Sequence, residues 1–162
     1  MKNSLRRLPA FLLALLLALA ATPAALADQQ VRLPDSAFTL TLPDWLEYDG
    51  PGDSPDDALF AYVSEKHGLD IQFFREPARD ATVRTMAEVL IRDGMDASVE
   101  RIGGIDMTVY RVADPQDPPE QAMQCIGYVF LDGETAWMIV FWYADQAAAD
   151  ETAEIIRSIR KD

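Results

Sequence analysis

Cysteine and histidine are nearly absent from this 162-residue chain, which contains one of each. A single cysteine excludes an internal disulfide framework, and a single histidine excludes a metal site built from several histidines. Basic residues are also few, since 14 Lys and Arg stand against 27 Asp and Glu, for a formal net charge of −13. A chain this acidic is repelled by phosphate backbones, so we exclude nucleic acid as a partner.

The short motifs of the common enzyme classes are also missing. The sequence has no Gly-x-Ser-x-Gly elbow and no glycine-rich phosphate loop. Cys125 lies in an apolar segment, where a thiol is usually buried and inert, and His67 lies in an expected turn. Nothing in their spacing predicts that the two side chains meet. A small hydrolase that uses carboxylates stays an alternative because acids are abundant, but the pattern assigns no catalytic residue.

The first 27 residues have the order of parts that is typical of an export signal. Basic residues at Lys2, Arg6 and Arg7 precede an apolar core over 11–21, and small residues follow as far as Ala27. This core is shorter than the roughly 20 residues that span a bilayer. We therefore expect cleavage before residue 28 and no transmembrane segment afterwards, with an uncleaved anchor as the alternative.

Export would change the charge of the protein and decide where it acts. Removing the three basic residues of the signal leaves 11 basic against 27 acidic residues, a net charge of −16. We expect a secreted, periplasmic or envelope-associated protein with one domain over residues 28–162. The high acidity favours solubility in itself and cationic partners in addition.

Hydrophobic periodicity predicts an α+β domain in which hairpins join most strands. Strands are expected at 38–42, 59–64, 69–74, 99–102, 107–112, 123–131 and 136–143, and helices at 82–93 and 145–160. The last two strands are apolar on both faces and are joined by Asp132-Gly133, so they should be central in the sheet. We expect an antiparallel sheet of six or seven strands with helices packed on both faces, an α/β/α sandwich.

Two loops rich in acid and proline, 49–57 and 114–120, are the candidate cation sites. The first contains Asp49, Asp53, Asp56 and Asp57. Calcium binds several oxygen ligands that converge on one point, which makes this loop the better candidate. Neither loop has the Asp-x-Asp-x-Asp-Gly ladder, and a solvated acidic surface is the simpler interpretation. A calcium-binding or calcium-stabilised extracellular domain is therefore an alternative function, and calcium is the one cofactor left open.

Two aromatic residues next to the first acidic loop are the candidate ligand-binding residues. Trp45 and Tyr48 border this loop and lie outside the strongly apolar segments. Exposed aromatic side chains are common anchors of binding surfaces. Trp137 and Trp142, by contrast, belong to an apolar strand and are expected to pack in the core.

Several segments together resemble the PsbP-like domain family, whose fold is shared by the photosystem II extrinsic P protein and the Ran-binding Mog proteins. They are the strand 38–42 (FTLTL) leading into Pro43-Asp44-Trp45, a mid-chain helix before a Gly-Gly hairpin that ends in Tyr110-Arg111, and a paired apolar hairpin before the final 155–159 (IIRSI). These segments, taken in this order, cover most of residues 31–160. The resemblance implies an antiparallel sheet with helices on both faces.

The same resemblance implies binding and assembly more than catalysis. No motif here allows the family's functional residues to be carried over, because a fold does not fix a function. We expect a small exported bacterial member that is not an enzyme and that binds a protein, peptide or envelope component. The sequence predicts neither the identity of that ligand nor the oligomeric state.

Overall fold

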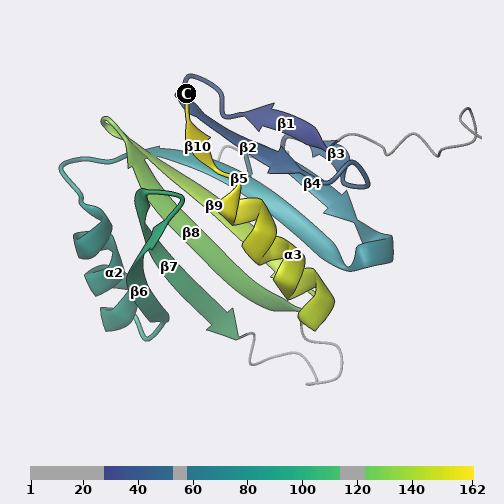
Figure 1. The fold of residues 1–162 in the computed structure, drawn as a ribbon. Coiled ribbons are helices and arrows are strands. Elements are labelled where there is room, and N and C mark those ends of the chain that lie inside the picture. Colours follow the sequence, from purple (N-terminus) through teal and green to yellow (C-terminus); the bar gives the residue numbers. More distant parts are fainter. Residues whose placement is uncertain (1–27, 53–57, 114–122) are drawn as a thin grey trace, which may run out of the picture.

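The computed structural model describes residues 28–52, 58–113 and 123–162. Within these ranges the chain forms ten β-strands, two α-helices and one 3-10 helix (Figure 1). The strands are β1 (Gln29–Arg32), β2 (Phe38–Leu42), β3 (Glu47–Gly50), β4 (Phe60–Ser64), β5 (Leu69–Pro77), β6 (Asp96–Ile102), β7 (Ile105–Ala113), β8 (Gln124–Asp132), β9 (Thr135–Tyr143) and β10 (Arg160–Lys161). The helices are η1 (Glu65–His67), α2 (Val83–Arg92) and α3 (Gln146–Arg157).

The larger sheet has seven antiparallel strands in the order β3-β4-β5-β9-β8-β7-β6. Strand β9 is therefore the middle strand, and β8 pairs with it from Gln124 opposite Tyr143 to Asp132 opposite Thr135. The prediction that the two most apolar strands are central is confirmed. Two α-helices and a mostly antiparallel sheet also agree with the predicted α+β class.

A second sheet of three short strands was not predicted from the sequence. Strand β2 pairs antiparallel with β1 on one side and with β10 on the other. Strand β3 was also missed, and the loop expected from residue 49 begins within it. Tyr48 pairs with Tyr62 of β4 before a register shift at Gly50, and the four residues of β3 give no alternating pattern because three of them are exposed and none is buried.

One hydrophobic cluster joins the two sheets and α3. It includes Leu40 and Leu42 of β2, Phe130 and Trp137 of the large sheet, and Ile156 of α3. Side chains alternate across a sheet, so neighbours such as Val129 and Met138 point to the opposite face. One face of the central strands is thus fully buried in the core.

Helix α3 ends earlier than the sequence predicts. The chain leaves the helix at Ser158, whose hydroxyl donates to the Ile155 carbonyl (2.6 Å) and accepts from the Thr41 amide (2.8 Å). Arg160 then pairs with Thr39 of β2, so the last residues of the predicted helix form β10 instead. Ile159 is buried as expected, although it lies outside the helix. Neither helix of the described residues is long and apolar enough to cross a membrane.

Candidate functional site

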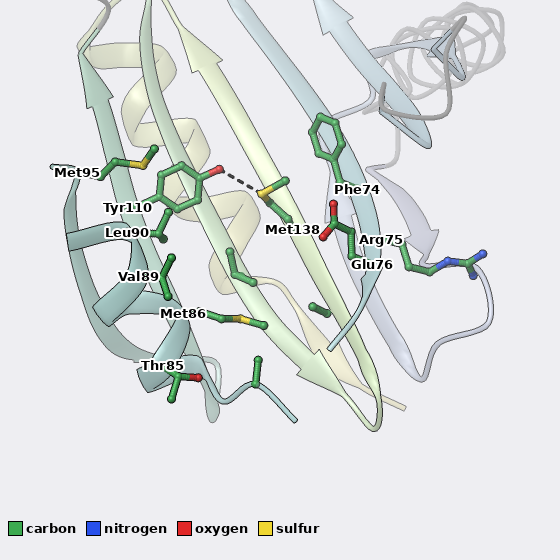
Figure 2. Close-up of a pocket in the computed structure, with 13 residues that line it drawn as sticks. Phe74, Arg75, Glu76, Thr85, Met86, Val89, Leu90, Met95, Tyr110 and Met138 are labelled. Atoms are coloured by element: carbon green, nitrogen blue, oxygen red, sulfur yellow. Dashed lines mark hydrogen bonds between the residues drawn. The ribbon is translucent and has the colours of Figure 1, made fainter. Parts of the chain in front are cut away.

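A hollow of about 380 Å³ lies between α2 and the large sheet, and we call it the α2 groove. Figure 2 shows α2 along one side and β9 and β5 along the other. Nearly all of the lining is apolar, and three of its residues are methionines. The full lining is Phe74, Arg75, Glu76, Ala81, Thr85, Met86, Val89, Leu90, Met95, Tyr110, Val129, Ala136 and Met138.

Local sequence rules place both walls of this groove. Thr82 caps α2 by accepting from the Thr85 amide (3.1 Å), and Gly94 follows the helix with a φ of +89°. Helical spacing then brings Met86, Val89 and Leu90 to the groove. On the sheet side, strand alternation turns Val129 and Met138 away from the core and toward the same space.

Much of the apolar surface of α2 is exposed. Ala87 is its one buried residue, whereas Val89 is 43% exposed and Ile91 is 54% exposed. Val89 borders the groove, and Ile91 lies on the other flank of the helix. A helix with strong amphipathic patterning and so little burial leaves apolar surface for another molecule.

Tyr110 is the one buried polar residue of the groove lining. Its ring lies over Gly127, where a β-carbon would collide with the ring carbons. Its hydroxyl donates to the Met138 sulfur at 3.2 Å, and burial raises the pKa of Tyr110 to about 12. A thioether is a weak acceptor. The hydroxyl therefore keeps most of its hydrogen-bonding capacity within an apolar wall.

One charged side chain enters the groove from β5. Arg75 turns to the other side of that strand, where it pairs with Asp35 at 2.9 Å, whereas Phe74 and Glu76 lie on the groove side (Figure 2). The rim of the α2 groove is therefore acidic at Glu76. Since this is one carboxylate beside apolar walls, the arrangement can bind an apolar group but does not pair two acids for acid–base chemistry.

A second hollow of about 340 Å³ adjoins the first and shares Phe74 with it. Its lining is more polar and includes Asp49, Gly50, Ala61 and Gln72. Phe74 separates the apolar space beside α2 from this acidic space over β3, β4 and β5. The two together form one surface that changes from apolar to acidic across the sheet.

The two predicted ligand-binding residues lie apart. Trp45 packs its ring against His67, with centroids 4.0 Å apart, and contacts the core cluster. Tyr48 is 61% exposed and makes an edge contact with Tyr62 at 5.4 Å. Trp45 lines a cavity of about 510 Å³ with His67 and the start of α3, and Tyr48 does not line that cavity. A single site formed by both residues stays a prediction.

The calcium prediction also stays untested. Of its four residues, Asp49 lies in β3, and Asp53, Asp56 and Asp57 lie outside the described residues, as does the acidic part of 114–122. No cluster of three or more potential ligands among His, Cys, Asp and Glu occurs in the described residues. A calorimetric titration with calcium, read beside the melting temperature, tests this alternative.

Cys125 and His67 have separate surroundings. Cys125 is buried on β8, and burial raises the pKa of its thiol to about 11, so little thiolate forms near neutral pH. His67 accepts from or donates to the Ser64 hydroxyl at 2.9 Å and stacks on Trp45. These contacts do not supply an activated nucleophile.

The α2 groove was missed in the sequence because its two walls come from segments with ordinary core patterns. Met86 and Leu90 read as the buried face of a helix, and Val129 and Met138 as central strand residues. Their partial exposure depends on where α2 rests on the sheet. Helical periodicity places Val83, Met86, Ala87, Leu90 and Ile91 on one face, and Val89, an apolar residue beside that face, was the one available signal.

This geometry defines a PsbP-like α+β fold with an apolar groove, and comparison of structures supports the fold. The solution structure of cyanobacterial PsbP (CyanoP) from Synechocystis sp. PCC 6803 is similar with a TM-score of 0.60 and 9% identity, over 88% of this chain and 96% of that one. A crystal structure from Bacteroides thetaiotaomicron VPI-5482 is similar with a TM-score of 0.58 and 17% identity, over 85% of this chain.

Both likenesses concern the fold alone, given the low identities. The chain spans about half of the Bacteroides protein, with 49% of that chain covered. No protein-family model matches the sequence, and no curated protein matches it.

Proposed function

We propose that this protein is an exported, non-enzymatic member of the PsbP-like domain family that binds an apolar segment of a protein, peptide or envelope component in the α2 groove. The observation that carries the proposal is the lining of the groove. A space of about 380 Å³ is bounded almost entirely by apolar side chains, with Glu76 at its rim. Concave apolar sites with few polar groups are the usual form of a binding site.

The packing of the two helices supports the wider architecture that we propose, an α/β/α sandwich. Helix α3 supplies Ile155 and Ile156 to the core with Phe130, whereas α2 lies against Val129, the next residue of β8. Adjacent strand residues point to opposite faces. In this architecture α2 covers only the β6–β8 part of its face, and the groove is the space beside it.

Binding of a neutral apolar dye tests the groove without knowledge of the natural ligand. We expect Nile red fluorescence to rise with the mature domain and to saturate near one dye per molecule. Val89→Gln should weaken binding about tenfold because it adds a polar amide to the wall. Ile91→Gln is the matched control, since Ile91 is also exposed on α2 but lies on the other flank.

A capture experiment then tests the function. The mature domain and its Val89→Gln variant are incubated with native envelope extract, with a photo-crosslinker at position 85 on the groove side of α2. Material that crosslinks to the first and not to the second supports the proposal. Equal dye binding and equal crosslinking by both proteins would contradict it.

A further inference from the structure

We propose that the α2 groove and the acidic surface beyond Phe74 receive one amphipathic helix of a partner protein, with its apolar face on β9 and basic residues along β5. The inference depends on the proposed function, because it uses the same groove, and it adds the shape and charge of the partner. Three features support this inference: the spacing of the strands beside α2, the order of side chains on β5, and the unsatisfied carboxylate of Asp70.

The distance between α2 and the open part of the sheet matches a second helix. Helix α2 packs mainly on β6 and β7. Strand β9 is two strands from β7 in the sheet, which is about 10 Å at the usual strand spacing. Packed helices lie about 8–10 Å apart. Since α2 lies over β6 and β7 together, a helix over the β8–β9 pair is two strand spacings away and would pack against the groove side of α2 at an ordinary distance.

The floor of this position is apolar. Met138, Val140 and Trp142 alternate along β9 on the groove side, opposite Phe74, Gln72 and Asp70 of β5. Val140 is buried, and Met138 and Trp142 are half-buried, so both retain exposed apolar surface. Methionine adapts its shape to different apolar partners, which suits a groove that receives a helix face.

The far wall on β5 carries an acid at each end. Asp70, Gln72, Phe74 and Glu76 are alternate residues and share one face of the strand. Six residues of strand separate the two carboxylates by about 20 Å. A helix rises about 1.5 Å per residue, so about 14 residues span this distance. Basic residues near both ends of such a helix would meet Glu76 and Asp70.

Asp70 has an unsatisfied carboxylate oxygen on this surface. Its Oδ2 accepts from the Gln72 amide at 3.1 Å, and its Oδ1 is buried without a hydrogen-bond partner among the described residues. Burial raises the pKa of Asp70, and the nearby charge of Asp49 raises it further. Because Oδ1 is enclosed by the protein, a lysine or arginine of a partner would compensate the charge of Asp70 from the surface, without reaching this oxygen.

An acyl chain fits this surface less well than a helix does. A chain of methylene groups would fill the space beside α2 but would leave the polar wall of Asp70 and Gln72 without donors. The formal charge of −13 also favours a cationic partner over an anionic lipid. The occupant that satisfies both parts of the surface is a basic amphipathic helix.

Synthetic peptides test this inference on the mature domain. The probe is a fluorescein-labelled peptide of about 14 residues with leucine at i, i+3, i+4 and i+7 spacing and lysine elsewhere. One control has the same composition in scrambled order, and the other has glutamate in place of lysine. By fluorescence anisotropy we expect the amphipathic lysine peptide to bind at least about tenfold more tightly than either control, with a gain of helical circular dichroism.

Matched variants separate the groove from general attraction to an acidic protein. Val89→Gln and Glu76→Gln should each weaken the peptide about three- to tenfold. Ile91→Gln replaces an exposed aliphatic side chain on the other flank of α2, and Glu100→Gln neutralises an exposed carboxylate on β6. Both controls should leave the affinity for the peptide unchanged. Native circular dichroism of each variant shows that it is folded.

The outcomes distinguish this inference from the proposed function. Equal binding of the ordered and scrambled peptides, or full affinity in Val89→Gln, would overturn the helix proposal. If Nile red or a dansyl-labelled fatty amide still binds in a Val89-dependent manner while the peptide does not, the apolar groove stands and its occupant is an acyl chain. If neither dye nor peptide responds to Val89→Gln, both proposals are wrong.

Discussion

Tyr110 and Gly127 depend on each other, and their contact forms one end of the groove. They are opposite residues of β7 and β8. The absence of a side chain at Gly127 lets the Tyr110 ring lie flat across the strand, where its hydroxyl reaches Met138. A glycine within a central strand usually weakens it, and an aromatic cross-strand neighbour compensates for this loss.

Adding a methyl group at position 127 should therefore displace the ring. We expect Gly127→Ala to lower the free energy of unfolding by about 1–3 kcal/mol, because the new β-carbon meets ring atoms that have little room to move. Urea denaturation measures this change. In a Tyr110→Ala background the same substitution should cost less than about 0.5 kcal/mol, and a coupling energy near zero would contradict the contact.

At the level of elements, the sequence predicted best those strands that have a long hydrophobic pattern and pair with a strand nearby in the sequence. The β4–β5, β6–β7 and β8–β9 hairpins are joined by short connections and agree with their predicted positions. Strands β1, β3 and β10 have four, four and two residues, which is too short for a clear period. Strand β10 also pairs with β2 across most of the chain, which no local pattern specifies.

For the candidate site, too, the sequence predicted local structure but not the contacts between distant segments. The groove residues of α2, β7, β8 and β9 were placed on the correct elements, whereas Arg75 and Glu76 lie beyond the predicted end of their strand, and the space between the walls depends on packing. Trp45 was predicted as a ligand residue because it borders a loop, yet its ring contacts His67 of η1. Whether an aromatic side chain stays exposed depends on contacts between distant segments of the chain. Hydrophobic periodicity gives no information about such contacts.

Helix α3 begins with a side-chain cap that the sequence order anticipates. The Asp145 carboxylate accepts from the Ala148 amide at 3.0 Å and satisfies a donor that the first turn leaves free. We expect Asp145→Ala to lower stability by about 1 kcal/mol in thermal or urea unfolding. Asp150→Ala removes an exposed acid that accepts from Gln146 within the helix, and it should change stability by less than about 0.5 kcal/mol. Equal losses in the two variants would contradict a capping role.

For the whole molecule, Asp132 ties the two sheets together at the β8–β9 turn. Its Oδ2 accepts from the Ser36 hydroxyl (2.8 Å) and the Ala37 amide (3.1 Å), which lie just before β2. Its Oδ1 lies 3.7 Å from the Lys161 ammonium of β10. Figure 1 shows β10 beside β2, so the carboxylate holds the start of the middle strand β2 and its neighbour β10 near the large sheet.

These contacts predict how stability depends on pH. The Ser36 hydrogen bond, followed by the Ala37 amide and Lys161, lowers the pKa of Asp132 in the folded protein below its ordinary value. A carboxyl group with a depressed folded pKa stabilises the protein fully above the unfolded pKa of about 4 and loses this contribution as pH falls through the lower folded value. We expect Asp132→Asn to lower the free energy of unfolding by about 1–2 kcal/mol at pH 7 and to flatten its decline below about pH 4. Urea titrations from neutral to acidic pH measure both effects.

Asp106→Asn, which removes an exposed ion pair with Arg101, should leave the profile nearly unchanged. If the Asp132→Asn profile ran parallel to that of the wild type, the carboxylate would not link the two sheets through its charge.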